Sequence, residues 1–395
     1  MLEKVLELPL SCKTPIWTGG LDKGRGPEMI KETGLLGSLR WWTEAVLRCM
    51  GYYVCEPTST SQDNGGRCPR ELNKCPHYCA GCAIFGATGR KRSFRLEVDY
   101  PKQQQGINVE YLRIKPEGRT HGWYLYPAVT SDFTLKIMPL RSCFDPVLLL
   151  LPFSIAAGWG AIGGKMRLGY GVVEIKENFG REVTIEHFQR AIRELFEATG
   201  HWIENHPNRA GLPNLKNMFF ARIQFTADKG SLLKNEDLPR ETDAWLNKFS
   251  LSSLPLTPLV KNWLRFGDGR QLWLPPEPCN EKAIEKWLFG FIAGENRQAG
   301  KINVSWVYPL GKDEWELRLW GWLPGDGTAP DGFNRRYFLA KLQSHLESPK
   351  SKGKTLLGII PPDSIKQIEW RVYKPGQSEE NFLRSLISAD GKEEG

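Results

Sequence analysis

The stretch DPVLLLLPFSIAAGWGAIGGKMRLGYGVVEIK, residues 145–176, combines a helix, a glycine-rich loop and a strand in one segment. Asp145–Pro146 is typical of a helix start, because Asp can cap the first turn and Pro suits the first helical position. The apolar helix that begins there runs into a glycine-rich loop at 158–171. Residues 171–176 then alternate between apolar and polar positions, which predicts a strand.

The segments before this stretch complete a regular order of elements. Alternation over 4–12 predicts a strand, and apolar residues at three- and four-residue steps predict a helix over 35–50. Residues 51–93 are polar and rich in Cys, as in an irregular insertion, and strands follow at 94–98 and 133–138. The resulting order is βαββαβ, which is the ferredoxin-like order.

The second half of the chain repeats this order. Thr184 caps an amphipathic helix that ends at Gly200, and 201–216 is a predicted linker. We therefore expect an α+β fold of two tandem ferredoxin-like (RRM-like) domains, 1–205 and 206–395, with an insertion at about 51–93 in the first. The elements expected in the second domain are a strand at 219–226, helices at 241–249 and 281–292, strands at 302–308 and 315–322, a helix at 333–346 and a strand at 368–373.

Length and composition exclude several classes of protein. The chain has 395 residues, 41% hydrophobic and 25% charged, which rules out a disordered tail, a collagen-like fibre and a disulfide miniprotein. The net charge of +8 and the 15 Trp residues are weak indications of a nucleic-acid partner. Residues 1–10 lack the apolar core of a secretory leader, and the apolar run 147–164 is too broken to span a bilayer. We expect a soluble, cytoplasmic protein.

Four cysteines within fifteen residues predict a structural zinc site. Cys55 and His77 are spare candidate ligands, and the alternative is a loop with incidental thiols. A structural zinc needs no open coordination position. The expected zinc ligands are Cys68, Cys75, Cys79 and Cys82.

The glycine-rich loop differs from a nucleotide-triphosphate loop. Trp159 stands where a Walker A loop needs Gly, and Met166 stands where it needs Ser or Thr. The backbone amides could still approach phosphates, with Lys165 and Arg167 supplying charge. The alternative is a loop that is rich in glycine because it turns tightly, and the residues leave both interpretations open.

Other cationic and aromatic residues are candidate RNA contacts. Trp42, Trp287 and Trp315 fit apolar faces and are expected in the core, whereas Trp41 and Arg40 fall off the apolar stripe of their helix. Catalytic sets are weak: Asp22, His121 and Lys165 are the best candidates for RNA cleavage without metal. The remaining candidate contacts are Ser38, in the same helix, and Arg90, Lys91 and Arg92, in the basic run at 89–95.

Two motifs resemble those of a known family. TPIWTGG at 14–20 and LGSLRWW at 36–42 resemble the opening of the RAMP proteins of CRISPR systems, most of all the first subunit of the type III-B Cmr effector complex. Residues 85–86, the loop at 158–171 and KINVS at 301–305 agree with that family. The resemblance implies two RNA-recognition-like domains in a subunit that holds the 3′ part of the guide RNA and the facing end of the target.

The resemblance also implies site residues and partners. In such complexes a different RAMP subunit cuts the target with an Asp in the loop after its first strand, and Asp22 lies in the comparable loop here. The implied partners are guide crRNA, target RNA and other RAMP subunits, with no membrane. The alternatives are a metal-independent RAMP endoribonuclease, for guide processing or target cleavage, and a zinc-stapled protein-interaction module. By position, the implied RNA contacts are Ser38, Arg40, Lys165 and Arg167, with Arg297 and Lys301 in the second half.

Overall fold

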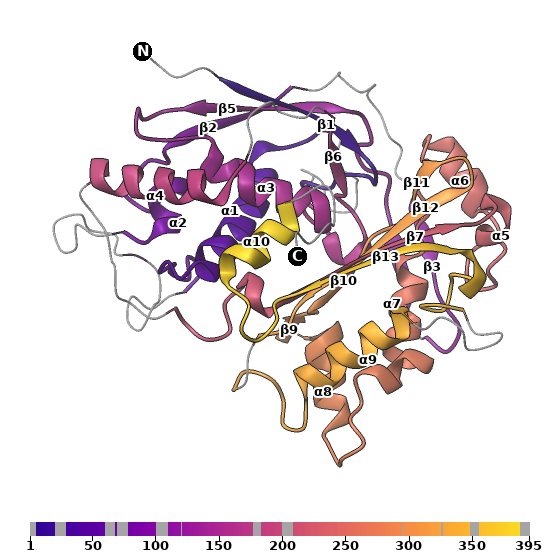
Figure 1. Ribbon diagram of the computed structural model, residues 1–395. Helices are drawn as coiled ribbons and strands as arrows, with labels where there is room; N and C mark the ends of the chain where they lie inside the picture. The colour runs from indigo at the N-terminus through magenta and orange to yellow at the C-terminus, as the bar shows by residue number, and fades with distance from the viewer. Residues whose placement is uncertain are drawn as a thin grey trace.

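Two antiparallel sheets, each covered by helices, form the mixed α+β architecture of this chain (Figure 1). The structure is a computed structural model. It describes residues 5–19, 29–59, 68, 78–99, 110–119, 121–176, 183–199, 208–294, 296–324, 327–347 and 355–387.

The first sheet has the strand order β2-β5-β1-β6, with every neighbouring pair antiparallel. Alternation along the strands sends one face to the core, where Leu8 of β1 lies opposite Leu135 of β5. The helices α1, α3 and α4 pack together beneath this face (Figure 1). The strands are β1 (Leu6–Cys12), β2 (Phe94–Asp99), β5 (Phe133–Pro139) and β6 (Val173–Ile175), and the helices are α1 (Glu32–Cys49), α3 (Val147–Trp159) and α4 (Ile185–Thr199).

The second sheet has the order β10-β12-β7-β13. A fifth strand, β11, pairs with the first residues of β12. The odd-numbered residues of its central strand, such as Phe219 and Ile223, enter a core that is covered by α7, α8 and α9. The strands are β7 (Met218–Thr226), β10 (Ile302–Val304), β11 (Tyr308–Gly311), β12 (Glu314–Trp322) and β13 (Ile365–Val372). The helices are α7 (Thr257–Phe266), α8 (Glu281–Phe289) and α9 (Arg335–Glu347).

The opposite face of the second sheet packs against the first half of the chain. Phe220 of β7 stacks against Trp42 at a centroid distance of 6.3 Å. Arg318 of β12 donates hydrogen bonds to the carbonyls of Ala157 and Gly160, at 2.6 and 3.2 Å, and so binds the carboxyl end of α3. The last helix, α10 (Glu379–Ile387), also packs against α3 and α4. The two halves therefore share a buried seam.

Most expected elements are confirmed within one to three residues, and the differences have local causes. The predicted helix 281–292 ends at Phe289, because Gly290 has φ +78° and a Cβ there would lie 2.6 Å from the Gln298 carbonyl. The predicted strand 302–308 is broken between β10 and β11. The region 51–93, expected to be irregular, contains α2 (Ala80–Phe85).

Several short elements were not anticipated. The hairpins are β3 (Leu112–Ile114) with β4 (Trp123–Leu125), and β8 (Gly290–Ala293) with β9 (Asn296–Ala299). The remaining helices are α5 (Lys229–Leu233), α6 (Thr242–Lys248) and the 3-10 turns η1 (Met166–Leu168), η2 (Leu215–Asn217), η3 (Asp268–Leu272) and η4 (Pro362–Ser364). Among the described helices, none has the length and apolar character needed to cross a membrane.

Candidate metal centre and candidate nucleic-acid interface

Four buried cysteines meet beside α1 and α2. The Sγ atoms of Cys55, Cys68, Cys79 and Cys82 all lie within 4.8 Å of one another, and those of Cys55 and Cys82 are 3.6 Å apart. Zinc–thiolate bonds of about 2.3 Å in a tetrahedron place sulfurs about 3.8 Å apart. The four thiols therefore match the size and donor chemistry of a closed structural zinc site.

Local backbone structure presents two of these sulfurs together. Cys79 caps the amino end of α2, where its Sγ accepts a hydrogen bond from the Cys82 amide at 3.4 Å. The Cys79 amide donates to Cys68 Sγ at 3.3 Å. Amide donors of this kind stabilise negative sulfur, as the outer contacts of a metal site do.

A helix of the first core holds the cluster from the other side. Arg40 of α1 donates to Cys82 Sγ at 3.3 Å and to Glu44 Oε1 at 2.7 Å. Arg48 pairs with the second oxygen of Glu44 and donates to the Cys55 carbonyl at 3.1 Å. The cationic residue of the LRWW motif thus contacts the four-cysteine cluster.

Three of the predicted ligands, Cys68, Cys79 and Cys82, are brought together as expected. The fourth member of the observed group is Cys55, which the sequence offered only as a spare. The four-cysteine cluster therefore joins the segment that follows α1 to the start of α2. Cys75 and His77 lie outside the described residues.

The glycine-rich loop is hydrogen-bonded to Trp17, in the middle of the TPIWTGG segment. Its Gly164 amide donates to the Trp17 carbonyl, and Gly163, at φ +85°, would place a Cβ 2.7 Å from that same oxygen. On the far side, Gly169 has φ +91°, and a Cβ there would lie 2.3 Å from Trp306 Cδ1. Close packing accounts for these glycines, which supports the tight-turn interpretation and leaves the cations between them as candidate ligands for phosphate.

Four cations lie on this loop and on the segments of the second half that contact it. Lys261 of α7 donates to the Arg167 carbonyl at 2.6 Å, and Lys301 precedes β10, which contacts the η1 turn. Lys165 precedes η1, with Nζ 3.3 Å from the centre of the Trp17 ring. No carboxylate of the described residues lies within 4 Å of these four side chains, in contrast to the many paired cations elsewhere. We call Lys165, Arg167, Lys261 and Lys301 the seam cluster.

The electrostatics of the seam cluster favour an anionic ligand. Burial and the charges of Arg167 and Arg265 lower the pKa of Lys261 to about 7. Burial lowers the pKa of Lys165 to about 8, and burial together with Arg167 lowers that of Lys301. A phosphate placed among these groups would restore their charge and offset their repulsion.

The other predicted RNA contacts lie apart from the seam cluster. Ser38 and Arg40 belong to α1, where Ser38 is buried and Arg40 faces the metal centre. Trp41 is half-buried and packs edge-on against Trp42 at 5.0 Å. Arg297 is exposed on β9. Their RNA-binding roles stay predictions. In the basic run, Lys91 is exposed and Arg92 half-buried, while the Arg90 guanidinium lies 4.8 Å from the Tyr78 ring.

The expected core tryptophans are confirmed. Trp42 is fully buried and donates its indole hydrogen bond to the Ala161 carbonyl at 3.0 Å. Trp287 and Trp315 are also buried in the second core. The sequence analysis did not select Lys261. It is an isolated cation on an amphipathic segment, and no recognisable motif surrounds it.

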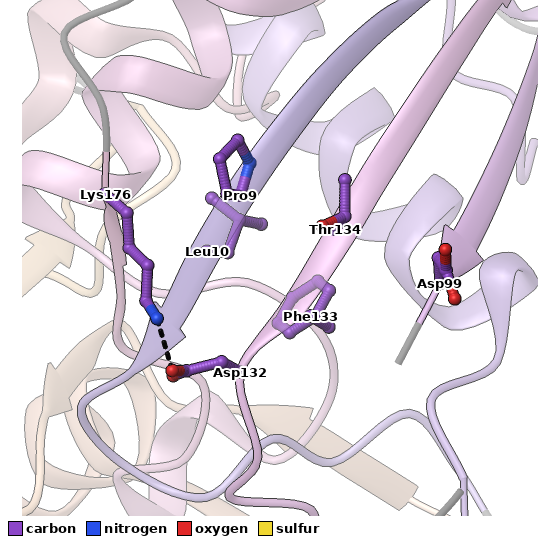
Figure 2. A pocket seen from close by; sticks show the side chains of 7 residues that line it. All are labelled: Pro9, Leu10, Asp99, Asp132, Phe133, Thr134 and Lys176. Carbon is purple, nitrogen blue, oxygen red and sulfur yellow. Dashed lines mark hydrogen bonds and ion pairs between the residues drawn. The ribbon is translucent and has the colours of Figure 1, made fainter. Parts of the chain in front are cut away.

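The outer face of the first sheet carries a shallow hollow of about 390 Å³ (Figure 2). Figure 2 shows Lys176 turned toward Asp132, with which it forms an ion pair, while Asp99 stands on the far side. That ion pair lowers the pKa of Asp132. Phe133 of β5 lines the hollow but is buried, and the partly or fully exposed residues of β1, β2 and β5 are not aromatic. This face therefore lacks the exposed stacking surface of an RNA-recognition sheet.

Of the three candidates for RNA cleavage, the structure describes His121 and Lys165. His121 is exposed near β4, with no carboxylate of the described residues within 4 Å. Asp22 lies outside the described residues.

Residues 9–174 match the family model of the RAMP superfamily. This match covers less than half of the chain. It includes most of the first sheet, the four-cysteine cluster and the glycine-rich loop. TPIWTGG and LGSLRWW therefore lie inside the match, whereas KINVS at 301–305 lies outside it. No curated protein sequence matches this chain.

Solved structures of CRISPR proteins resemble this chain at low identity. Cmr1 from Pyrococcus furiosus in its apo form is 14% identical with a TM-score of 0.37, over 98% of this chain and 96% of that one. A chain of the Type III-B Cmr-beta complex bound to cognate target RNA and AMPPnP is 13% identical with a TM-score of 0.40, over 87% and 100%. A chain of a Type IV-B CRISPR complex is 14% identical with a TM-score of 0.29, over 45% and 93%.

Proposed function

We propose that this chain is a non-catalytic, RNA-binding RAMP subunit of a type III-B CRISPR effector complex. In that role it holds the 3′ part of the guide crRNA and the facing end of the target RNA in antiviral defence, alongside other RAMP subunits. The observation that carries this proposal is the seam cluster, which lies at the glycine-rich loop of a RAMP superfamily segment.

The seam cluster fits a phosphate backbone better than a small ligand. Its four cations come from the loop, from α7 and from the residue before β10, so they belong to both halves of the chain. Contacts between phosphates and Lys or Arg supply affinity without reading sequence. In a guide–target duplex the sequence is read by base pairing, so a subunit of this kind needs only such contacts.

The test is the salt dependence of single-stranded RNA binding by the full chain. Lys261→Gln and Lys301→Gln should each weaken binding and reduce the slope of log K against log salt by about 0.7, the value for one phosphate contact on a single strand. Lys136→Gln removes the same charge from the outer face of the first sheet and serves as the matched control. A wild-type chain that shows no salt-sensitive RNA affinity and does not assemble with RAMP neighbours would contradict the proposal.

We assign two ferredoxin-like RAMP domains, 1–205 and 206–395, to this subunit. The support is that both sheets repeat one order, in which the second, third, first and fourth strands of a βαββαβ unit lie side by side. The first unit carries the metal centre between its first helix and its second strand.

The metal that we propose for the four cysteines is zinc. Cys55, Cys68, Cys79 and Cys82 would hold it with no open position, so it would staple the insertion and take no part in chemistry. Free thiols in this number suit a reducing compartment, which agrees with a cytoplasmic role.

Two rival functions make different predictions. A metal-independent RAMP endoribonuclease would cleave labelled RNA in the presence of chelator, and Asp22→Ala or His121→Ala would abolish that cleavage. A zinc-stapled interaction module would assemble with its partners, while Arg40→Ala and Lys165→Ala would leave RNA loading unchanged.

A further inference from the structure

The β3–β4 hairpin gathers the exposed aromatic side chains of the described residues. Tyr111 and Tyr124 are 49% and 43% exposed, and Phe266, at 46%, is the third aromatic residue with such exposure in the described part of the chain. The Arg119 guanidinium joins Phe266 to the hairpin, since it lies 5.0 Å from that ring and 4.2 Å from the ring of Trp123. Exposed rings concentrated on one surface indicate a binding site.

Two of these rings continue a row that begins at the glycine-rich loop. Trp17 lies 6.0 Å from Tyr126, Tyr126 lies 5.8 Å from Tyr111, and Tyr111 lies 5.0 Å from Tyr124. The buried Tyr170 hydroxyl fixes the middle of the row, because it donates to the Tyr126 carbonyl at 2.7 Å and accepts from the Tyr126 amide at 3.0 Å. We call Trp17, Tyr126, Tyr111 and Tyr124 the aromatic row.

A cation stands at each end of the aromatic row. Lys165 Nζ lies 3.3 Å from the Trp17 ring, and the Arg113 guanidinium lies 5.8 Å from the Tyr124 ring. No carboxylate within the described ranges comes within 4 Å of either cation. The nearby Glu110 carboxylate is already paired with Lys248 at 2.8 Å. The surface is therefore both aromatic and positively charged.

The hairpin is held against the second core, which makes the aromatic row a rigid surface. Leu112 and Leu125, directly opposite each other, are buried there. Trp245 donates its indole hydrogen bond to the Glu110 carbonyl at 3.0 Å, and the Glu117 amide donates to Asp237 at 2.7 Å. Figure 1 places β3 among the elements of the second half. Rings held in place lose little freedom on binding, which favours affinity.

We propose that the aromatic row binds a single-stranded RNA segment by stacking unpaired bases on Tyr111 and Tyr124. This inference depends on the proposed function, because the row begins at Lys165 of the seam cluster and would receive the strand whose phosphates that cluster binds. Bases in a duplex already stack on one another, so only a splayed strand can use such rings. Stacking accepts every base, as a guide of variable sequence requires.

The test uses the full chain with Tyr111→Leu and Tyr124→Leu together, titrated with a labelled 20-nucleotide polyuridylate at several salt concentrations. Loss of a base–aromatic stack should raise Kd at least about fivefold, while the slope of log K against log salt stays unchanged. The matched control, Tyr111→Phe with Tyr124→Phe, keeps both rings and should bind as the wild type does. Lys261→Gln should change the slope instead.

Each outcome decides between the inference and the proposed function. Normal RNA binding by the Leu variant, with weakened binding by Lys261→Gln, would overturn the aromatic row and leave the proposed function standing. Normal RNA binding combined with failure to assemble with RAMP neighbours would show a protein-binding surface and also overturn it. Absence of RNA binding by the wild-type chain would contradict the proposed function itself. Photocrosslinking of 5-iodouridine RNA to the wild-type chain should give adducts at Tyr111 or Tyr124, and adducts confined to other sites would refute the inference without relying on any variant.

Discussion

Replacing Arg318 by Met should remove the main charge that holds the two halves together. Its guanidinium lies 3.2 Å from the fully buried Glu316 carboxylate and 2.7 Å from the Tyr308 hydroxyl. It also donates to the carbonyls of Ala157 and Gly160 at the carboxyl end of α3. Met has similar length and no charge, so the substitution removes these bonds with little change in packing.

The magnitude follows from what the substitution leaves behind. Glu316 would keep only one ion pair, with Arg222 at 3.0 Å, and the carbonyls at the end of α3 would lose a donor. Breaking a buried pair by removing one partner costs about 3–5 kcal/mol. We expect Arg318→Met to lower the free energy of unfolding by this amount. Adding Glu316→Gln should cost less than the sum of the two single changes, because the buried carboxylate that lost one of its two cations is then absent.

The pH dependence provides a second measurement. Burial by itself would raise the pKa of Glu316, but Arg318 and Arg222 outweigh it and lower the pKa from 4.5 to about 2. Because the folded pKa is depressed, the stabilisation is present above pH 4.5 and is lost as the pH falls toward 2. The shift corresponds to about 3 kcal/mol, and Arg318→Met should remove much of it.

The assay is urea unfolding followed by tryptophan fluorescence at about pH 7 and about pH 3. Lys366→Met is the control, since it breaks an exposed ion pair with Glu314 and should cost less than about 1 kcal/mol. If Arg318→Met costs no more than this control, or if its loss is the same at both pH values, Glu316 is hydrated and the reasoning is wrong.

Three further changes test the metal centre, the seam cluster and the loop. Cys55→Ser should abolish stoichiometric zinc binding by elemental analysis, whereas Cys143→Ser, outside the cluster, should preserve it. RNA affinity should fall as the pH rises from about 6.5 to about 9, because Lys261, whose pKa is about 7 in the free chain, loses the proton that phosphate favours. Calorimetry in two buffers of different ionisation enthalpy should show that RNA binding takes up protons. An affinity that does not change with pH would exclude Lys261 from the interface. Gly169→Ala should lower the free energy of unfolding by more than about 1 kcal/mol, because its φ is +91° and its Cβ would meet Trp306. Gly37→Ala, whose Cβ meets no atom within 4 Å in α1, should instead raise it by about 0.5–1 kcal/mol in thermal unfolding, and equal effects of the two would refute the packing argument.

Much of the secondary structure could be predicted from local signals. Alternation over 219–226 predicted β7, and Thr184 predicted the start of α4, where its hydroxyl accepts from the His187 amide at 3.1 Å. The short hairpin at 112–125 was not predicted, because each of its strands has only three residues, too few to establish a period.

The site was predictable where chemistry lies within one segment. Cys68, Cys79 and Cys82 were identified by their spacing, which is a property of the chain, and the cations Lys165 and Arg167 by their glycine neighbours. Cys55 was not selected, because its distance in sequence gives no indication that α1 brings it 3.6 Å from Cys82 Sγ.

Tertiary structure alone decided which cations act together. Arg40 and Arg167 looked equivalent as sequence, yet folding pairs Arg40 with Glu44 and sets the Arg167 carbonyl beside Lys261, nearly a hundred residues away. The cause is physical: periodicity and spacing depend on neighbours along the chain, whereas desolvation, ion pairing and the alignment of aromatic rings depend on which segments pack against each other.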